Sequence, residues 1–186
     1  MKIIAISDTH ISSGSIIDYL PEGLMKLMKT ADIVIHTGDF ITKQVYDELK
    51  AFCRLEAVHG NMDEMKLKIL LPERKSIDVG GVKIGIVHEA TLSINDTTGA
   101  RYLAKEMDVD ILIFGHIHKP LIEKSDVLLV CPGSPTSPRL SELSAVELVI
   151  QNREITGKVI TFEGTRCSSI ESMKDFHARS LKTPEK

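Results

Sequence analysis

Several short apolar segments of this sequence each end in a side chain that is able to bind a metal ion. The segments are IIAIS, IVIHTG, LEAVHG, KIGIV and ILIFG. Short β-branched segments predict buried strands, and sites assemble at the carboxyl ends of strands in open α/β sheets. The residues that follow these segments are, in chain order, Asp8 with His10, Asp39, Asn61, His88, and His116 with His118. The pattern predicts a sheet structure with a polar site at one edge.

The first part of the chain alternates predicted strands with predicted helices. Strands are expected at 2–7, within 32–39 and within 54–61, and helices within 16–30 and over 42–52, where Thr42 is the expected N-cap. The later part favours hairpins at 75–88, 120–134 and 144–162, with turns near Gly80–Gly81, Ser125–Asp126 and Asn152–Arg153. A helix over 96–107, with Asp96 as a candidate N-cap, and a strand over 110–116 complete this part. The order predicts one α/β domain over residues 1–162 whose sheets are mixed.

Residues 163–186 are polar and carry little apolar pattern. We interpret them as a C-terminal tail, with a short helix around 168–180 as one option.

Composition narrows the class of protein. The 186 residues carry a net charge of −3 and only 4% aromatic residues, which weighs against nucleic acid as a partner. There is no stretch of 18 apolar residues and no signal peptide pattern, so we expect a cytoplasmic protein that does not enter membranes. Cys53, Cys131 and Cys167 show no C-x-x-C spacing, which argues against a disulfide framework and a zinc ribbon.

The candidate ligands supply oxygen and nitrogen but no thiolate. Such sets suit Mn, Fe, Ni, Zn or Co. Seven ligands are too many for one ion with an open position, but they suit two ions that share a bridging carboxylate. Two-metal sites clamp the attacking and leaving oxygens of an in-line phosphoryl displacement, with a hydroxide between the ions as nucleophile. The two imidazoles of GHIH are then expected to serve one metal each, and Gly115 to ease the bend that this requires.

Other interpretations of single residues remain open at this point. Asn61 after Gly60 also suits a plain turn, and His88 has the weakest sequence context of the candidates. His36 lies within a strand and is expected to pack or to support a ligand. His59 and Arg139 are each compatible with a contact to substrate or with a purely structural role.

The motifs D-x-H, G-D, G-N, a lone H and G-H-x-H, in this order, resemble those of the calcineurin-like metallophosphoesterases. The size, the Gly60-Asn61-Met62-Asp63 form and the stretch CPGSPTSPR (residues 131–139) are most similar to the small prokaryotic branch, whose members are often phosphodiesterases and are related to the retromer scaffold subunit. The resemblance implies an α/β fold: a four-layer αββα sandwich of two mixed β-sheets flanked by helices, with two divalent metal ions at one end.

The resemblance also implies how the ligands divide between the metals. The first metal would take Asp8, His10, Asp39 and His118, and the second would take Asp39, Asn61, His88 and His116. Catalytic roles would fall on Asp39, Asn61 and Asp63, the last as a group that orients a histidine or a water.

The chain departs from the family pattern at two informative positions. Many phosphomonoesterases of the superfamily carry a proton-donating histidine where this chain has Met62. Glu89 adds a negative charge that would repel highly charged monoesters. We therefore expect a phosphodiesterase acting on a small phosphate ester. The alternatives are a protein-binding scaffold, as in the retromer subunit, and with less support a phosphomonoesterase or a nuclease. Small relatives are often dimers, so a homo-oligomer is expected.

Overall fold

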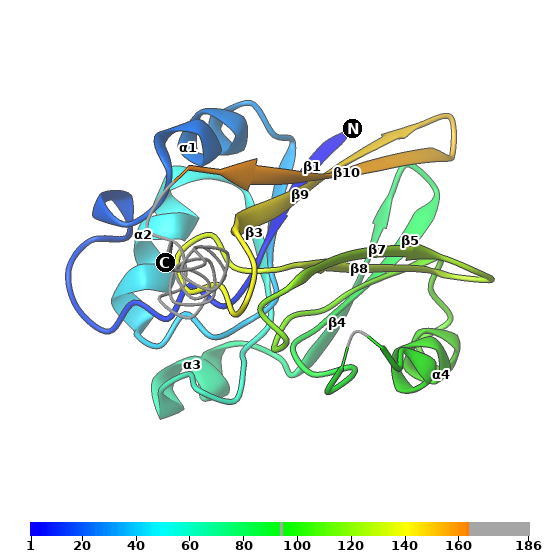
Figure 1. Cartoon of the computed structure of the whole chain (residues 1–186), viewed down its shortest axis with the longest axis horizontal. Helices are drawn as coiled ribbons and strands as arrows, with labels where there is room; N and C mark the ends of the chain where they lie inside the picture. The colour runs from blue at the N-terminus through cyan, green and yellow to red at the C-terminus, as the bar shows by residue number, and fades with distance from the viewer. Residues whose placement is uncertain (94, 164–186) are drawn as a thin grey trace, which may run out of the picture.

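Two five-stranded mixed sheets form the centre of the structure, a computed structural model that describes residues 1–93 and 95–163 (Figure 1). The first sheet has the order β10-β9-β1-β2-β3. Its strands are β1 (Lys2–Ile6), β2 (Ile33–His36), β3 (Leu55–Ala57), β9 (Leu143–Gln151) and β10 (Glu154–Phe162). The second sheet has the order β4-β5-β6-β8-β7. Its strands are β4 (Arg74–Val79), β5 (Val82–Val87), β6 (Ile111–Ile113), β7 (Pro120–Lys124) and β8 (Leu128–Pro132).

The strands that precede the candidate ligands run parallel to their neighbours. In the first sheet β1, β2 and β3 are parallel, with Ile6 opposite His36 and His36 opposite Ala57. In the second sheet β5, β6 and β8 are parallel. The loops after β1, β2 and β3 therefore leave the same edge of one sheet, and the loops after β5 and β6 leave the same edge of the other.

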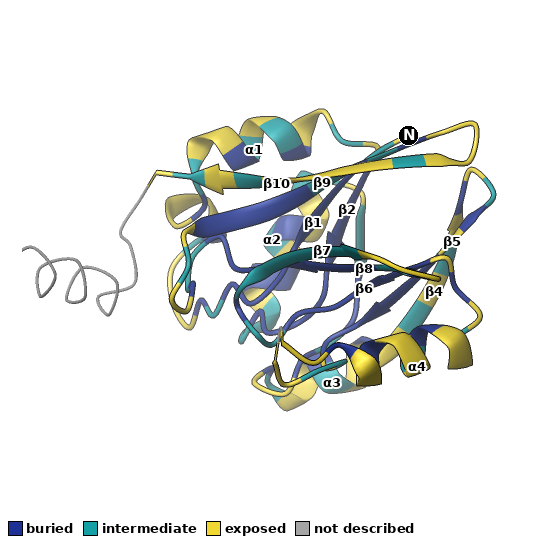
Figure 2. Cartoon of the chain, turned by 45° about the vertical axis from the view of Figure 1, so that its right-hand side comes forward, coloured by how far each residue is buried: buried dark blue, intermediate teal, exposed yellow. Residues whose placement is uncertain are grey.

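Helices cover the outer faces of both sheets, which gives the four layers that the sequence predicts. Isoleucines and valines of the two inner faces, among them Ile3, Ile84 and Ile111, pack against each other between the sheets. Leu24 of α1 (Glu22–Lys29) and Leu49 of α2 (Lys43–Phe52) pack on the outside of the first sheet. Helix α4 (Thr98–Glu106) covers the second sheet through Ala100 and Ala104. Figure 2 shows the inner strands buried, while the outward faces of α1 and α4 and much of β10 are exposed.

The expected hairpin turns are confirmed at Gly80–Gly81 and Asn152–Arg153, where all four residues have positive φ, as a two-residue turn of the primed type requires. The strand ends lie within two or three residues of the expected ones. The predicted span 16–30 contains a short 3₁₀ helix, Ile16–Asp18, before α1.

Three local details differ from the sequence prediction. Thr42 occupies the N-cap of α2, but its side chain makes no capping bond, and the Lys43 amide donates instead to Glu64 Oε1 at 2.8 Å. Helix α4 begins at Thr98, and Asp96 lies one position before its N-cap. The Asp96 side chain still accepts a bond from the Thr98 amide. The short helix α3 (Met65–Leu70) is not predicted, because only Leu67 of it is buried and no apolar stripe marks it.

Among residues 1–93 and 95–163, no helix is long and apolar enough to cross a membrane. The predicted tail helix, Cys167 and His177 lie outside the described residues.

Candidate metal centre

The structure brings all seven predicted ligands together at one end of the sandwich. They stand on the loops that follow five strands, β1, β2, β3, β5 and β6. The loops after β1 and β2 are joined by backbone bonds, since the amides of Asp8 and His10 donate to the carbonyls of Gly38 and Asp39, each at 3.0 Å. The amide of His116 donates to Asp8 Oδ2 at 3.0 Å and so ties the second sheet to the first.

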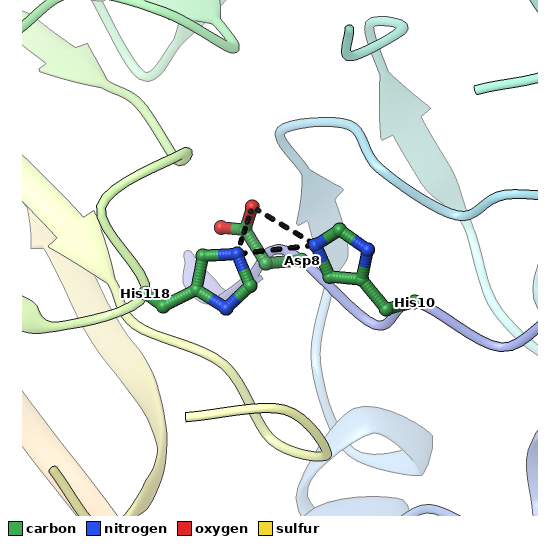
Figure 3. Close-up of side chains that lie close together, drawn as sticks. All are labelled: Asp8, His10 and His118. Atoms are coloured by element: carbon green, nitrogen blue, oxygen red, sulfur yellow. Dashed lines mark hydrogen bonds and ion pairs between the residues drawn. The ribbon is translucent and has the colours of Figure 1, made fainter. Parts of the chain in front are cut away.

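A first group of ligands consists of Asp8, His10 and His118 (Figure 3). His118 Nε2 lies 3.4 Å from Asp8 Oδ1 and 3.1 Å from His10 Nε2. His10 Nε2 lies 3.8 Å from the same carboxylate oxygen. The Asp8 and His118 side chains are buried, and His10 is half-buried. One carboxylate oxygen and two imidazole nitrogens thus point into a single small space.

A second group consists of Asn61, His88 and His116. Asn61 Oδ1 lies 2.9 Å from His88 Nε2 and 3.2 Å from His116 Nδ1. Glu89, which is predicted from the sequence only to repel charged substrates, lies at the edge of this group with its Oε1 3.7 Å from His116 Nδ1. His88 is buried, whereas Asn61 and Glu89 are exposed.

Asp39 stands between the two groups. Its Oδ2 lies 3.4 Å from His10 Nε2 and 3.3 Å from His88 Nε2. Its Oδ1 accepts a bond from the Met62 amide at 2.8 Å. One carboxylate therefore faces both groups, with its orientation fixed by the backbone.

Hydrogen bonds on the far side of two imidazoles show which nitrogens face the centre with a lone pair. His88 Nδ1 lies 2.9 Å from the Thr37 carbonyl, so it carries the proton and donates. His118 Nδ1 donates in the same way to the Ser137 carbonyl. In neutral imidazoles both Nε2 atoms then present lone pairs to carboxylate oxygens, which is an unfavourable arrangement without a cation between them. The donor set and its geometry fit divalent metal ions.

The charges of the groups agree with this interpretation. Burial raises the pKa of Asp8, but the nearby imidazoles of His10, His118 and His88 outweigh it, so the pKa lies below its usual value. Burial also raises the pKa of Asp39, but the contact with His88 lowers it by more, so this pKa too lies below its usual value. For His88, burial lowers the pKa, but the bond to Asp39 and the nearby carboxylates raise it overall. The centre thus holds ionised carboxylates that attract positive charge.

Most of the predicted ligands adopt a left-handed backbone conformation. The φ angle is 54° at Asp8, 48° at His10, 60° at Asp39, 71° at His116 and 55° at His118. Such angles cluster at functional sites, and Asp and His tolerate them better than other residues with a side chain. The bend that aims both imidazoles of GHIH inward therefore lies at the histidines themselves and not at Gly115, whose φ is not positive.

Gly115 and Gly60 lie where side chains of other loops come very close to the backbone. A Cβ atom on Gly115 would lie 2.0 Å from Ser7 Oγ and 3.0 Å from Asp8 Oδ2. A Cβ atom on Gly60 would lie 2.1 Å from Asp39 Oδ1. A side chain at Gly60 would displace the candidate ligand Asp39, and one at Gly115 would displace Ser7 and crowd Asp8, which explains why glycine precedes Asn61 and His116.

The loop after β8, residues 133–142, supports the first group, a role that is not predicted from the sequence. Ser134 Oγ donates to the Asp8 carbonyl at 2.7 Å, and Thr136 Oγ1 donates to the Thr9 carbonyl at 2.6 Å. Ser141 Oγ donates to the His118 carbonyl at 3.1 Å. The signal in the sequence is the run of small hydroxyl residues directly after a buried strand.

Asp63 and His36 hold the ligand loops in place through hydrogen bonds. Asp63 Oδ2 accepts from the amides of Asp39 at 3.1 Å and Gly60 at 2.8 Å, and Oδ1 accepts from Ile41 at 2.7 Å. His36 Nδ1 accepts from the Gly38 amide at 3.1 Å, so Nε2 carries the proton toward Thr9 Oγ1 at 3.2 Å. Burial lowers the pKa of His36 to about 3, which keeps this link neutral.

Comparison with known proteins agrees with the geometry. Residues 1–153 match the family model of the calcineurin-like phosphoesterase superfamily domain. The chain is 33% identical over 171 residues to a probable metallophosphoesterase of Methanothermobacter thermautotrophicus, covering 91% of this chain and 98% of that protein. It is 36% identical over 165 residues to a probable metallophosphoesterase of Methanocaldococcus jannaschii, covering 88% and 82%.

Among solved structures, Vps29 from Entamoeba histolytica complexed with Zn²⁺ is similar, with a TM-score of 0.67 at 26% identity, over 88% of this chain and 100% of that one. The chain belongs to the calcineurin-like phosphoesterase superfamily, within the branch of small prokaryotic members. The family and the ligand groups together support a metal-dependent phosphoesterase.

Proposed function

We propose that the chain is a phosphodiesterase that works with two divalent metal ions. Asp8, His10, Asp39 and His118 would hold the first ion, and Asp39, Asn61, His88 and His116 the second. The observation that carries this proposal is the position of Asp39 Oδ2, at 3.4 and 3.3 Å from an imidazole of each group. Manganese, nickel, iron, cobalt and zinc all suit such ligands.

A pair of bound ions would supply Lewis acidity and a water of lowered pKa for in-line displacement at phosphorus. The residues of the chain supply the orientation. Asp39 is fixed by the Met62 amide and, through its own amide, by Asp63. The imidazoles of His88 and His118 are fixed by backbone carbonyls. Ligands held in this way need little rearrangement when substrate arrives.

Two side chains favour diesters over monoesters. Met62, at the position of the proton-donating histidine in many phosphomonoesterases, is 57% exposed and has no proton to give to a leaving group. The Glu89 carboxylate lies at the second group and repels a dianionic monoester more than a monoanionic diester. Diesters with good leaving groups are the substrates that this site favours.

The decisive experiment replaces the shared carboxylate. Asp39→Asn keeps an oxygen that accepts from the Met62 amide but weakens both metal sites, so turnover of bis-nitrophenyl phosphate should fall at least about a hundredfold. Asp47→Asn, on the exposed face of α2, is the matched control. Both variants would be assayed with Mn²⁺, Ni²⁺, Co²⁺ and Mg²⁺ against nitrophenyl diesters, nitrophenyl monoesters and cyclic nucleotides. Near-normal activity of Asp39→Asn would reject the assignment.

A protein-binding platform is the second candidate, and one surface favours it. Met62, Met65 and Ile69 are 57%, 69% and 79% exposed and lie on α3 and the turn before it, next to Asn61. If the protein fails to bind Mn²⁺ or Ni²⁺ in stoichiometric amounts and hydrolyses no activated diester, this second function is favoured.

A further inference from the structure

The metal centre is flanked by two hollows on the protein surface. One, of about 250 Å³, is lined by His59, Asn61 and His88 among others. The other, of about 380 Å³, lies beyond His116 and is lined by Lys119, Arg139, Leu92 and Leu140 among others. A phosphodiester has two arms, and a hollow on each side of the ligands gives each arm a place.

Lys119 and Arg139 place two positive charges in the second hollow. No carboxylate among residues 1–93 and 95–163 forms an ion pair with Lys119 or Arg139, whereas many other cations of the chain are paired, such as Lys75 with Glu56 and Arg74 with Glu106. Cations that have no ion pair within the described part of the chain, and that lie beside a phosphate site, are available to an anionic ligand.

The backbone holds both cations next to the first group of ligands. Lys119 directly follows His118, and the Arg139 amide donates to the His118 carbonyl at 3.5 Å. The two residues that flank the Pro138-Arg139-Leu140 segment also contact His118, through the Ser137 carbonyl and the Ser141 hydroxyl.

Apolar surface surrounds the cations. Leu92 is 84% exposed and Leu140 is 58% exposed, and both line the hollow. Isolated exposed leucines need no explanation, but two of them beside Lys119 and Arg139 form a surface for a ligand with an organic body and a negative end.

Resting on the proposed function, we propose that this hollow binds one arm of the diester and that this arm carries a second anionic group, such as a further phosphate on a nucleoside. Lys119 and Arg139 would contact the anion, and Leu92 and Leu140 the organic body. These residues would then select among diesters without taking part in the displacement.

A matched pair of substrates tests the proposal. Thymidine 5′-(p-nitrophenyl phosphate) and its 3′-phosphorylated form release the same leaving group and differ only in the second anion. The Mn²⁺-loaded protein should prefer the phosphorylated form in kcat/KM. Lys119→Gln and Arg139→Gln should each lower that preference about fivefold, which corresponds to about 1 kcal/mol. Lys124→Gln, at the far end of β7, should leave it unchanged. A preference that is absent from the unmodified protein, or that survives both substitutions, overturns the proposal.

Binding separates this proposal from the proposed function. If neither substrate is hydrolysed, calorimetry would compare thymidine 3′,5′-bisphosphate with thymidine 5′-monophosphate as ligands of the metal-loaded protein. Tighter binding of the bisphosphate that Lys119→Gln and Arg139→Gln both reduce supports the anion site, even though the phosphodiesterase proposal has failed. Equal binding of the two ligands overturns the anion site.

Discussion

The two halves of the metal centre differ in how firmly the fold holds them. In the first half Asp8 and His118 are 0% and 2% exposed, and hydroxyl groups of the loop after β8 hold the backbone on either side. In the second half Asn61 is exposed and the His116 side chain is 27% exposed. Only His88 of this half is buried and bonded to a carbonyl on its far side. The first half is organised by the protein, and the second is completed by side chains at the surface.

If two ions bind as proposed, this contrast predicts that their sites differ in affinity. Less reorganisation is needed where ligands are already fixed, so the first site should bind more tightly. The second site, closer to solvent, should lose its ion first when a chelator is added.

The largest effect is expected from removing one histidine of each half. His118→Gln should abolish the tighter of two Mn²⁺ binding events, with a loss of affinity of at least about a hundredfold. His116→Gln should keep the tight event and lose the weak one. Isothermal titration calorimetry measures both. If the two variants weaken the same event, the halves are not independent and the contrast fails.

Gly115→Ala should destabilise the fold strongly, because the new methyl group would lie 2.0 Å from Ser7 Oγ. We expect a loss of about 3 kcal/mol in the free energy of unfolding, measured by urea denaturation. Gly23→Ala is the control, since its Cβ would lie at an ordinary 3.6 Å from the Phe162 ring. Because Gly23 lies in a helix, alanine there should raise the free energy of unfolding by about 0.5–1 kcal/mol.

A double variant tests the stated cause. Ser7→Ala removes the colliding hydroxyl and should restore part of the stability lost in Gly115→Ala. If adding Ser7→Ala changes nothing, steric conflict with Ser7 does not explain the effect.

Ser134→Ala should cost about 2 kcal/mol of stability. The Ser134 hydroxyl donates to the Asp8 carbonyl at 2.7 Å and accepts from the Ser137 amide at 2.7 Å, so its loss leaves both groups unsatisfied in the interior. The variant should also weaken the tight Mn²⁺ event and spare the weak one. Ser125→Ala, in the turn between β7 and β8, should stay within about 0.5 kcal/mol of the unmodified protein. Equal losses in the two serine variants would remove the special role of this loop.

The last expected effect is the loss of stability in acid. The unfolded chain protonates His36 near its usual pKa of 6.5, whereas burial delays protonation in the fold to a pKa of about 3. The unfolded state therefore binds more protons between these values, and metal-free protein should lose up to about 1.4 kcal/mol of stability per pH unit as the pH falls through this range. His36→Gln should reduce this dependence of the free energy of unfolding on pH, as measured by urea denaturation at pH 6.5, 5.5 and 4.5. An unchanged slope would place the acid sensitivity in other groups.

The sequence predicts the sheets and the grouping of ligands because both depend on short-range patterns. Each strand is a short apolar segment, and each candidate ligand directly follows one. Parallel strands place the loops that follow them at one edge of the sheet. The ligand loops therefore converge, although Asp8 and His116 are 108 residues apart.

The support of the site is not predictable in the same way. Ser134 contacts Asp8, which lies 126 residues away in the sequence, and the local sequence around Ser134 does not indicate this partner. The helix α3 lacks an apolar stripe because it lies at the surface with a single buried leucine. The function of Gly115 also depends on Ser7 and Asp8, which reach it only in the folded chain.

The left-handed backbone at Asp8, His10, Asp39, His116 and His118 has an evolutionary consequence. Asparagine and glycine adopt this conformation at least as readily as aspartate and histidine do. A single replacement by glycine would remove a ligand, and one by asparagine would weaken it, while the loop keeps its path, so an inactive protein of the same shape lies one substitution away. Loss of catalysis in this architecture need not bring loss of folding, and selection for a new binding role has an intact framework on which to act.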